Sequence, residues 1–250
     1  MYKRFEKKTV LITNAKGIIG STCARLFHNE GANIVVNDKD RESMSKISDE
    51  LKTRILTTNE DLASNQGTKK MVDLALDSFG TIDALIFNEG APEPKDMQKI
   101  DVNFWETTVD RNLISIFHTL QEVYNIFKEK KDGSIVFVSS LGARSGIAGA
   151  TNYTSSSGGV LGVMKSVSKE WSRWGVTCSA VCPGVIEENV QGIPTSMKKQ
   201  FEQTQVELAS VRNVTADEVA KVILFLASED GKPINGQTIN VDYGLYIYML

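Results

Sequence analysis

Short runs of β-branched and other apolar residues alternate with longer helical patterns along the chain, and this alternation limits the fold more than any other feature. We predict strands at 9–13, 33–37, 54–57, 82–88, 133–139, 176–181 and 237–241. Helices are predicted at 20–30, 66–79, 104–130, 153–174 and 216–227. Such alternation is typical of βαβ units, in which helices connect parallel strands. The sequence therefore predicts an α/β fold, a doubly wound seven-stranded parallel sheet with helices on both faces.

Composition narrows the class of protein. A chain of 250 residues with 41 % hydrophobic content can bury a sizeable core, and we expect residues 1–250 to form one domain. A net charge of −3 without a basic stripe argues against nucleic acid as a partner. We see neither a signal-peptide pattern nor a membrane-spanning run of ~20 apolar residues, so we expect a soluble cytoplasmic protein. His28 and His118 lie apart from other ligand residues, which gives no metal site.

Several short motifs occur in a fixed order. They are Gly20 to Gly31-Ala32, Asp61, Phe79-Gly80-Thr81-Ile82-Asp83, Asn112-Leu113, Gly133 to Val136, Ser139-Ser140, Tyr153, Pro183-Gly184 and Gly236 to Asp242. With these motifs the chain resembles the classical short-chain dehydrogenase/reductase family over essentially its whole length. The resemblance implies a single Rossmann-type domain. It also implies hydride transfer between a nicotinamide cofactor and a secondary alcohol or carbonyl compound.

The family's catalytic tetrad is incomplete in this sequence. By resemblance, Tyr153 is the acid/base, Ser140 hydrogen-bonds the substrate oxygen and Asn112 holds a proton-relay water. The fourth member is a lysine four residues after the tyrosine, which lowers the pKa of the phenol and binds the nicotinamide ribose. Here that position is Ser157. A tyrosine in water titrates near ~10, so without a neighbouring cation only about 0.1 % is phenolate at neutral pH.

The cofactor turn after the first strand also departs from the family pattern, which is Thr-Gly-x-x-x-Gly-Ile-Gly. Asn14 and Ile18 replace the first two glycines, and only Gly20, the glycine that lets the helix pack on its strand, remains. Asn14 tolerates a left-handed conformation. Ile18 places a branched side chain where the pyrophosphate approaches bare main chain. A shifted alignment that uses Gly17 needs a gap between two fixed elements.

Two acidic residues alter the expected cofactor groove further. Glu89 stands where the family has alanine after the fourth strand, so a carboxylate would face the dinucleotide phosphates. Glu188 replaces the threonine that holds the nicotinamide carboxamide. Both changes argue against a normal dinucleotide site.

Two acidic residues of the adenosine side remain. Asp38 ends the second strand, where by resemblance a carboxylate accepts hydrogen bonds from the adenosine ribose and excludes a 2′-phosphate. Asp61 matches the aspartate beside the adenine. Each also has a structural interpretation, since Asp38 can end a strand and Asp61 can stabilise a turn. We expect no cofactor on this chain, and NAD rather than NADP if a dinucleotide is bound.

These losses lead to one hypothesis and two alternatives. We expect a non-catalytic subunit of a tetrameric hetero-oligomer. In this assembly an intact homologue would bind NAD and oxidise a secondary alcohol such as a 3-hydroxyacyl-CoA thioester. Such pairs within this family exist in anaerobic toluene breakdown. Gly158, Gly159 and Gly162 and the apolar tail 245–250 suit assembly. The alternatives are an active NAD-dependent oxidoreductase with an unusual cofactor loop, and a regulatory module that binds a small ligand.

Overall fold

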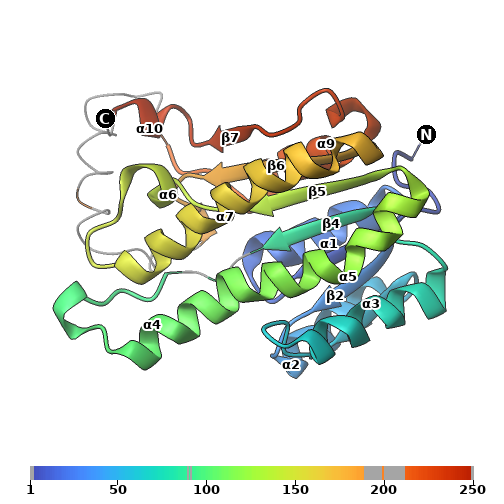
Figure 1. Cartoon of the computed structure of the whole chain (residues 1–250), viewed down its shortest axis with the longest axis horizontal. Coiled ribbons are helices and arrows are strands. Elements are labelled where there is room, and N and C mark those ends of the chain that lie inside the picture. Colours follow the sequence, from blue (N-terminus) through green and yellow to red (C-terminus); the bar gives the residue numbers. More distant parts are fainter. Residues whose placement is uncertain (1–2, 89, 91, 189–198, 200–211, 249–250) are drawn as a thin grey trace.

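The computed structural model describes residues 3–88, 90, 92–188, 199 and 212–248, and its sheet has the predicted architecture (Figure 1). Seven strands are parallel, in the order β3-β2-β1-β4-β5-β6-β7. Their bounds are β1 (Thr9–Thr13), β2 (Asn33–Asn37), β3 (Ile55–Thr58), β4 (Ala84–Asn88), β5 (Gly133–Val138), β6 (Val176–Pro183) and β7 (Thr238–Val241). The predicted strands are confirmed with shifts of one or two residues at their ends.

Helices cover both faces of the sheet. The main ones are α1 (Ile18–Asn29), α2 (Arg41–Leu51), α3 (Asn65–Phe79), α4 (Val102–Val109), α5 (Ser115–Lys130), α7 (Thr151–Trp171) and α9 (Ala216–Ala227). The short helices are η1 (Met97–Lys99), α6 (Gly142–Ser145), η3 (Ser172–Trp174), η5 (Glu229–Gly231) and α10 (Leu245–Tyr248). In the part of the chain that the structure describes, none of these helices combines the length and hydropathy needed to cross a bilayer.

The sheet separates two hydrophobic clusters. On one face, α3, α5 and α7 bury residues such as Met71, Phe127 and Met164 against the sheet. On the other face, α1, α2 and α9 bury residues such as Phe27, Met44 and Ile223. The central strands β1, β4, β5 and β6 are therefore covered on both sides, which explains why they appear in the sequence as largely apolar runs rather than as alternating patterns. The edge strands β3 and β7 are partly exposed.

One predicted helix differs in detail from the structure, and another helix was not predicted. The helix expected at 104–130 is interrupted by a π-helical segment, η2 (Asp110–Ile114), between α4 and α5. Helix α2 was missed because it has few apolar residues, of which Met44 and Ile47 are buried. Its beginning is fixed instead by Asp40, whose carboxylate accepts a hydrogen bond from the Ser43 backbone N–H at 3.0 Å.

The ends of β1 and β4 define where the cleft opens. The backbone ladder between β1 and β4 runs only from the pair Val10–Ala84 to the pair Ile12–Ile86. Beyond it, the side-chain hydroxyl of Thr13, the next residue of β1, bonds to the main chain of β4. The Asn88 backbone N–H donates to Thr13 Oγ1 at 3.0 Å, and this hydroxyl donates to the Asn88 carbonyl at 3.2 Å. Because the order of strands reverses between β1 and β4, this is the position at which α/β sheets bind ligands.

Helix α1 packs against the turn that precedes it through Gly20. A Cβ atom at this position would lie 2.6 Å from the Asn14 carbonyl oxygen and 2.9 Å from Ala15 Cα. The expectation that Gly20 is the packing glycine is consistent with these distances. We predict that Gly20→Ala destabilises the fold by about 1–3 kcal/mol, because backbone has to move.

Gly158 provides the control for this variant, since a Cβ there would have its nearest contact at 3.8 Å, the Ala143 carbonyl. Gly158→Ala should be neutral or stabilise by up to about 1 kcal/mol. Chemical denaturation of both variants measures the difference. Equal stability of the two would contradict the packing role of Gly20.

A capping box fixes the start of α9. The Thr215 hydroxyl accepts from the Glu218 N–H at 3.2 Å, and the Glu218 carboxylate accepts from the Thr215 N–H at 2.9 Å. This backbone hydrogen bond, with the Tyr243 hydroxyl and Arg212, lowers the pKa of Glu218 from 4.5 to about 2. The carboxylate form is therefore the stabilising one.

The lowered pKa predicts how stability changes with pH. Because the folded-state pKa is below the unfolded one, the contribution of Glu218 is complete above about pH 4.5 and is lost as the pH falls toward 2. Glu218→Gln should therefore lose less melting temperature than the unmodified chain between pH 5 and pH 2.5. Melting curves over this range test the prediction, and identical pH profiles would refute it.

Candidate functional site

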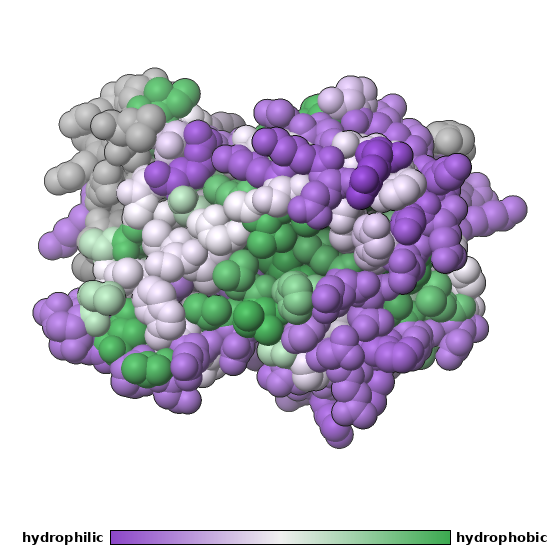
Figure 2. Space-filling view, viewed as in Figure 1, coloured by the Kyte–Doolittle hydropathy of each residue, from purple (hydrophilic) through white to green (hydrophobic). Residues whose placement is uncertain are grey.

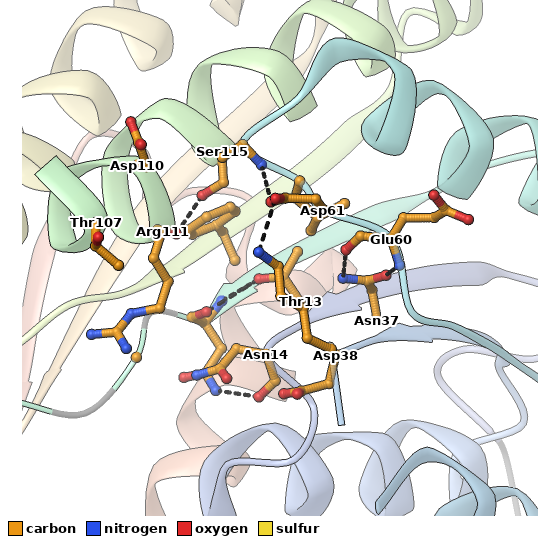
Figure 3. Close-up of a pocket in the computed structure, with 16 residues that line it drawn as sticks. Thr13, Asn14, Asn37, Asp38, Glu60, Asp61, Thr107, Asp110, Arg111 and Ser115 are labelled. Atoms are coloured by element: carbon orange, nitrogen blue, oxygen red, sulfur yellow. Dashed lines mark hydrogen bonds and ion pairs between the residues drawn. The ribbon is translucent and has the colours of Figure 1, made fainter. Parts of the chain in front are cut away.

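Two cavities of about 400 Å³ each lie at the carboxyl ends of the strands. The first, which we call the β2 cavity, is lined by the ends of β1, β2 and β4 and by residues of α4 and η2 (Figure 3). The second, the Tyr153 cavity, is lined by the turn before α1 and by residues that follow β5 and β6. The described residues Asn14, Asn88 and Gly90 line both cavities, which therefore adjoin each other.

Two of the predicted catalytic residues lie in the same cavity. Tyr153, in the first turn of α7, and Ser140, after β5, both line the Tyr153 cavity and are 7 % and 8 % exposed. The Ser140 hydroxyl oxygen accepts a hydrogen bond from the Gly142 N–H at 3.1 Å. This bond orients the hydroxyl while leaving its proton to donate. The structure thus brings together the pair expected to contact a substrate oxygen.

Asn112 lies in the π-helical segment η2 and is fully buried. Its Oδ1 atom accepts from the Gly90 N–H at 3.2 Å and from Arg111 Nε at 3.3 Å, and its Nδ2 donates to the Ser156 hydroxyl at 3.1 Å. The side chain thus connects the segment after β4 with α7, the helix that carries Tyr153. π-Helical turns are frequent at functional sites. The proton-relay role expected for Asn112 stays a prediction.

Ser157 does not line the Tyr153 cavity, where the lysine of the family would act. The residue has no exposed surface and does not line either cavity. Its backbone carbonyl accepts a hydrogen bond from the Ser139 hydroxyl at 3.0 Å, which fastens α7 to the end of β5. A hydroxyl is uncharged, so this position supplies no cation to the Tyr153 cavity.

In the turn before α1, Asn14 and Ile18 stand at the positions of the two missing glycines. Asn14 has a φ of 48°, the left-handed conformation that asparagine tolerates, as expected. Gly17 has a φ of −58°, a value that any residue can adopt. It therefore does not supply the glycine-specific conformation of the missing glycine. Ile18 is 40 % exposed and lines the Tyr153 cavity. Its side chain thus lies where a bare main chain was expected to meet phosphate.

Asp38 and Asp61 both line the β2 cavity and both make structural contacts. The Asp38 carboxylate accepts from the Lys16 N–H at 3.1 Å and from the Asp40 N–H at 3.0 Å. Asp61 accepts from the Ala63 N–H at 3.1 Å and pairs with Lys39 at 2.9 Å, which keeps its pKa below the usual range. The structural interpretations are consistent with these contacts, and the cavity position leaves the ligand-binding interpretation open.

Of the two glutamates that depart from the family pattern, Glu188 and Glu89, the structure describes only Glu188. Glu188 lines the Tyr153 cavity, but both of its carboxylate oxygens lie 3.3 Å from the Ala216 N–H at the beginning of α9. Its charge is therefore placed at a helix N-terminus, where the helix dipole stabilises an anion. Glu89 lies outside the described residues, so its expected repulsion of phosphate stays a prediction.

Three residues that the sequence analysis did not assign to the site hold it together. Asn88 donates from Nδ2 to the Asn14 carbonyl at 3.1 Å, which fixes the turn before α1 to β4. Lys39 lines the β2 cavity through its pair with Asp61. Arg111 lies between Asp110 and Asn112 in η2 and lines the same cavity. The sequence did not indicate a role for Lys39 or Arg111, because each is a single charged residue next to a motif.

Comparison with known proteins places this geometry in a family. A family model described as Enoyl-(Acyl carrier protein) reductase matches residues 12–246. The 3-oxoacyl-(acyl-carrier-protein) reductase FabG of Thermotoga maritima is 31 % identical over 247 residues, which cover 98 % of this chain and all of the relative. An acetoacetyl-CoA reductase of an Acinetobacter species is 28 % identical over 97 % of this chain and 99 % of the relative.

Solved structures agree with this assignment. A short-chain dehydrogenase/reductase described as glucose/ribitol dehydrogenase from Brucella melitensis superposes with a TM-score of 0.88 at 31 % identity, covering 98 % of this chain and 99 % of that one. Levodione reductase gives the same TM-score at 26 % identity, with the same coverage. Since the family model and these relatives span nearly all of the sequence, the chain belongs to the short-chain dehydrogenase/reductase family of oxidoreductases.

Proposed function

We propose that this chain is a non-catalytic subunit of a hetero-oligomeric oxidoreductase, in which an intact homologue binds NAD and transfers the hydride. The observation that carries the proposal is Ser157, a buried uncharged residue where catalysis in this family is expected to use a lysine. The named relatives act on 3-oxoacyl and acetoacetyl thioesters. The proposed substrate of the complex is accordingly a 3-hydroxyacyl or 3-oxoacyl thioester, converted on the partner.

The absence of a lysine at position 157 affects the proton transfer expected of Tyr153. Each pKa unit by which a neighbouring charge stabilises a phenolate corresponds to about 1.4 kcal/mol at the proton-transfer step. Position 157 cannot supply this stabilisation, because a serine hydroxyl carries no charge. The hydrogen bond from Ser139 goes to the backbone carbonyl of Ser157, so it does not depend on the side chain at this position.

The groove also fits a whole dinucleotide poorly. Ile18 occupies the lining of the Tyr153 cavity at the position that the family reserves for glycine, and Asn14 and Asn88 are hydrogen-bonded to each other between the two cavities. A pyrophosphate that spans the two cavities would have to pass these residues. We therefore propose that the chain carries no dinucleotide of its own. If one binds weakly, Asp38 favours NAD over NADP, because a second negative charge on the ribose would face a carboxylate.

A surface suited to assembly accompanies these losses. Figure 2 shows an apolar area at the centre of one face, over α5 and α7, with hydrophilic residues around it. Phe117 on α5 is 53 % exposed, and Gly162 on α7 is exposed with no atom within 4 Å of a Cβ built on it. A flat helix surface and an exposed aromatic ring favour close packing of another subunit. Val160 and Trp171, by contrast, are core residues of the chain itself.

The second candidate function is an active NAD-dependent oxidoreductase with an unusual cofactor loop. The left-handed conformation of Asn14 and the shared cavity of Tyr153 and Ser140 favour it, as do the names of the relatives, which are reductases. In this case Tyr153 would act without the lysine, and other groups would have to stabilise its phenolate.

Turnover of the purified chain separates the two candidates. We expect no oxidation of NADH with acetoacetyl-CoA, and none after Ser157→Lys alone, because Ile18 still restricts the groove. Spectroscopy at 340 nm measures both. Turnover that Tyr153→Phe abolishes would establish the second candidate and exclude the first.

Assembly gives an independent test. We expect the chain, co-expressed with intact homologues of its own genome, to be purified as a mixed oligomer. Gly162→Leu should weaken this assembly at least tenfold without lowering the melting temperature, because the added side chain meets no atom of the same chain within 4 Å at its Cβ. Ser78→Leu, an equally exposed small-to-large change on α3, serves as the control. Exclusive homo-oligomers, or equal affinities of the two variants, would contradict the proposal.

A further inference from the structure

A third cavity, which we call the α4 cavity, lies beside helix α4. Its volume is about 290 Å³, and its lining includes Glu93, Asp101, Phe104, Thr108 and Arg111. None of its described lining residues belongs to a strand, so the cavity lies away from the carboxyl ends of the sheet. The volume is just below the range of roughly 300–1,000 Å³ that holds small molecules, which suits a single side chain of a partner.

The lining of the α4 cavity is rich in hydrogen-bond acceptors. The hydroxyls of Thr107 and Thr108 each donate to the backbone carbonyl four residues earlier, at 2.8 and 3.0 Å. A hydroxyl that has used its proton in this way can only accept further hydrogen bonds. The carboxylates of Glu93 and Asp101 likewise only accept. Four side chains of the lining therefore call for a ligand that donates.

The charge of the lining also favours a cation. The described lining residues bring two carboxylates, Glu93 and Asp101, and one guanidinium, that of Arg111, which leaves one net negative charge. Two nitrogens of this guanidinium are already used, because Nε donates to Asn112 Oδ1 at 3.3 Å and Nη1 to Glu93 at 3.1 Å. The second carboxylate is thus the group that attracts an additional positive charge.

The wall formed by Asp101 and Phe104 already binds one cation of the chain itself. The ammonium of Lys95, which is not among the described lining residues, lies 3.2 Å from Asp101 Oδ2 and 4.5 Å from the centroid of the Phe104 ring. The Phe104 N–H donates to Asp101 Oδ1 at 2.8 Å and, with Lys95, keeps the pKa of this carboxyl below its usual range. Asp101 therefore stays ionised at neutral pH.

A buried acceptor next to this cavity lacks a donor. Asn152 on α7 is 1 % exposed, and its Nδ2 donates to Thr108 Oγ1 at 2.7 Å. Because the Thr108 proton is used on a carbonyl, the nitrogen of the amide has to face Thr108. Asn152 Oδ1 is then buried without a hydrogen-bond partner among the described residues, which is costly. A donor that enters the cavity beside Thr108 can satisfy this oxygen.

The surroundings of the cavity are those of a protein interface. Val102, at the start of α4, is 71 % exposed, and Met97 on η1 is 58 % exposed. Figure 1 shows α4 continuing through η2 into α5, the helix that carries Phe117 on the assembly surface. Arginine is among the residues that dominate interface energies, and its planar guanidinium offers five donors to several acceptors at once.

We propose that the α4 cavity receives an arginine side chain of the partner homologue. The guanidinium pairs with Glu93 and Asp101 and donates to the acceptors beside Thr108, while Val102 and Met97 contact apolar residues around it. This inference rests on the proposed function, because it names a residue type that the partner has to contribute.

The first test measures the affinity of the mixed oligomer by analytical ultracentrifugation. Glu93→Gln and Asp101→Asn, which remove one charge each at nearly constant shape, should weaken the association by about tenfold or more. Asparagine caps a helix as well as aspartate does, so Asp101→Asn should leave the melting temperature unchanged. Glu106→Gln, an exposed change on α4 outside the cavity, is the control and should have no effect.

The second test uses the isolated chain and two probes of equal shape, N-acetylarginine amide and its uncharged analogue N-acetylcitrulline amide. NMR titration should show the arginine probe binding about tenfold more tightly or better, and Asp101→Asn should remove this preference. Equal binding of the two probes, or association of the Glu93 and Asp101 variants as tight as that of Glu106→Gln, would overturn the inference. Mixed oligomers without these effects would leave the proposed function standing, whereas an absence of mixed oligomers would overturn both.

Discussion

The cleft depends on how β1 and β4 part at the centre of the sheet. Main-chain pairing between them ends at Ile12 and Ile86, and the Thr13 hydroxyl then holds the Asn88 main chain at 3.0 and 3.2 Å. The Asn88 amide in turn holds the turn before α1 through the Asn14 carbonyl. Buried polar groups with satisfied hydrogen bonds fix one geometry. This short network positions both cavities, and it persists although the phosphate-binding glycines are gone.

The two cavities differ in the residues that line them. The Tyr153 cavity contains a tyrosine and a serine that can meet a substrate oxygen, and Ile18 also lines it, whereas Ser157 lines neither cavity and carries no charge. The β2 cavity is lined by Asp38 and by Arg111, which is packed against Gly90. If the chain is the non-catalytic subunit that we propose, assembly with an active homologue is what maintains its fold.

The sequence predicted the sheet, because strands buried on both faces are apolar throughout, as in β1 and β4. It did not predict α2, whose only buried residues are Met44 and Ile47 and whose start is set by the Asp40 side chain. In the site, the turn at Asn14 followed from residue preferences. The contact of Glu188 with α9 and the position of Arg111 over Gly90 did not, because both depend on residues distant in the sequence meeting in space.

The most direct measurement is saturation-transfer-difference NMR of NADH with the isolated chain, which reports separately on each end of the dinucleotide. If the Tyr153 cavity no longer accepts nicotinamide, as we propose, the nicotinamide protons will receive no saturation. Equal saturation of the nicotinamide C4 protons, at low micromolar affinity, would show that the groove still binds the whole dinucleotide and would contradict the account.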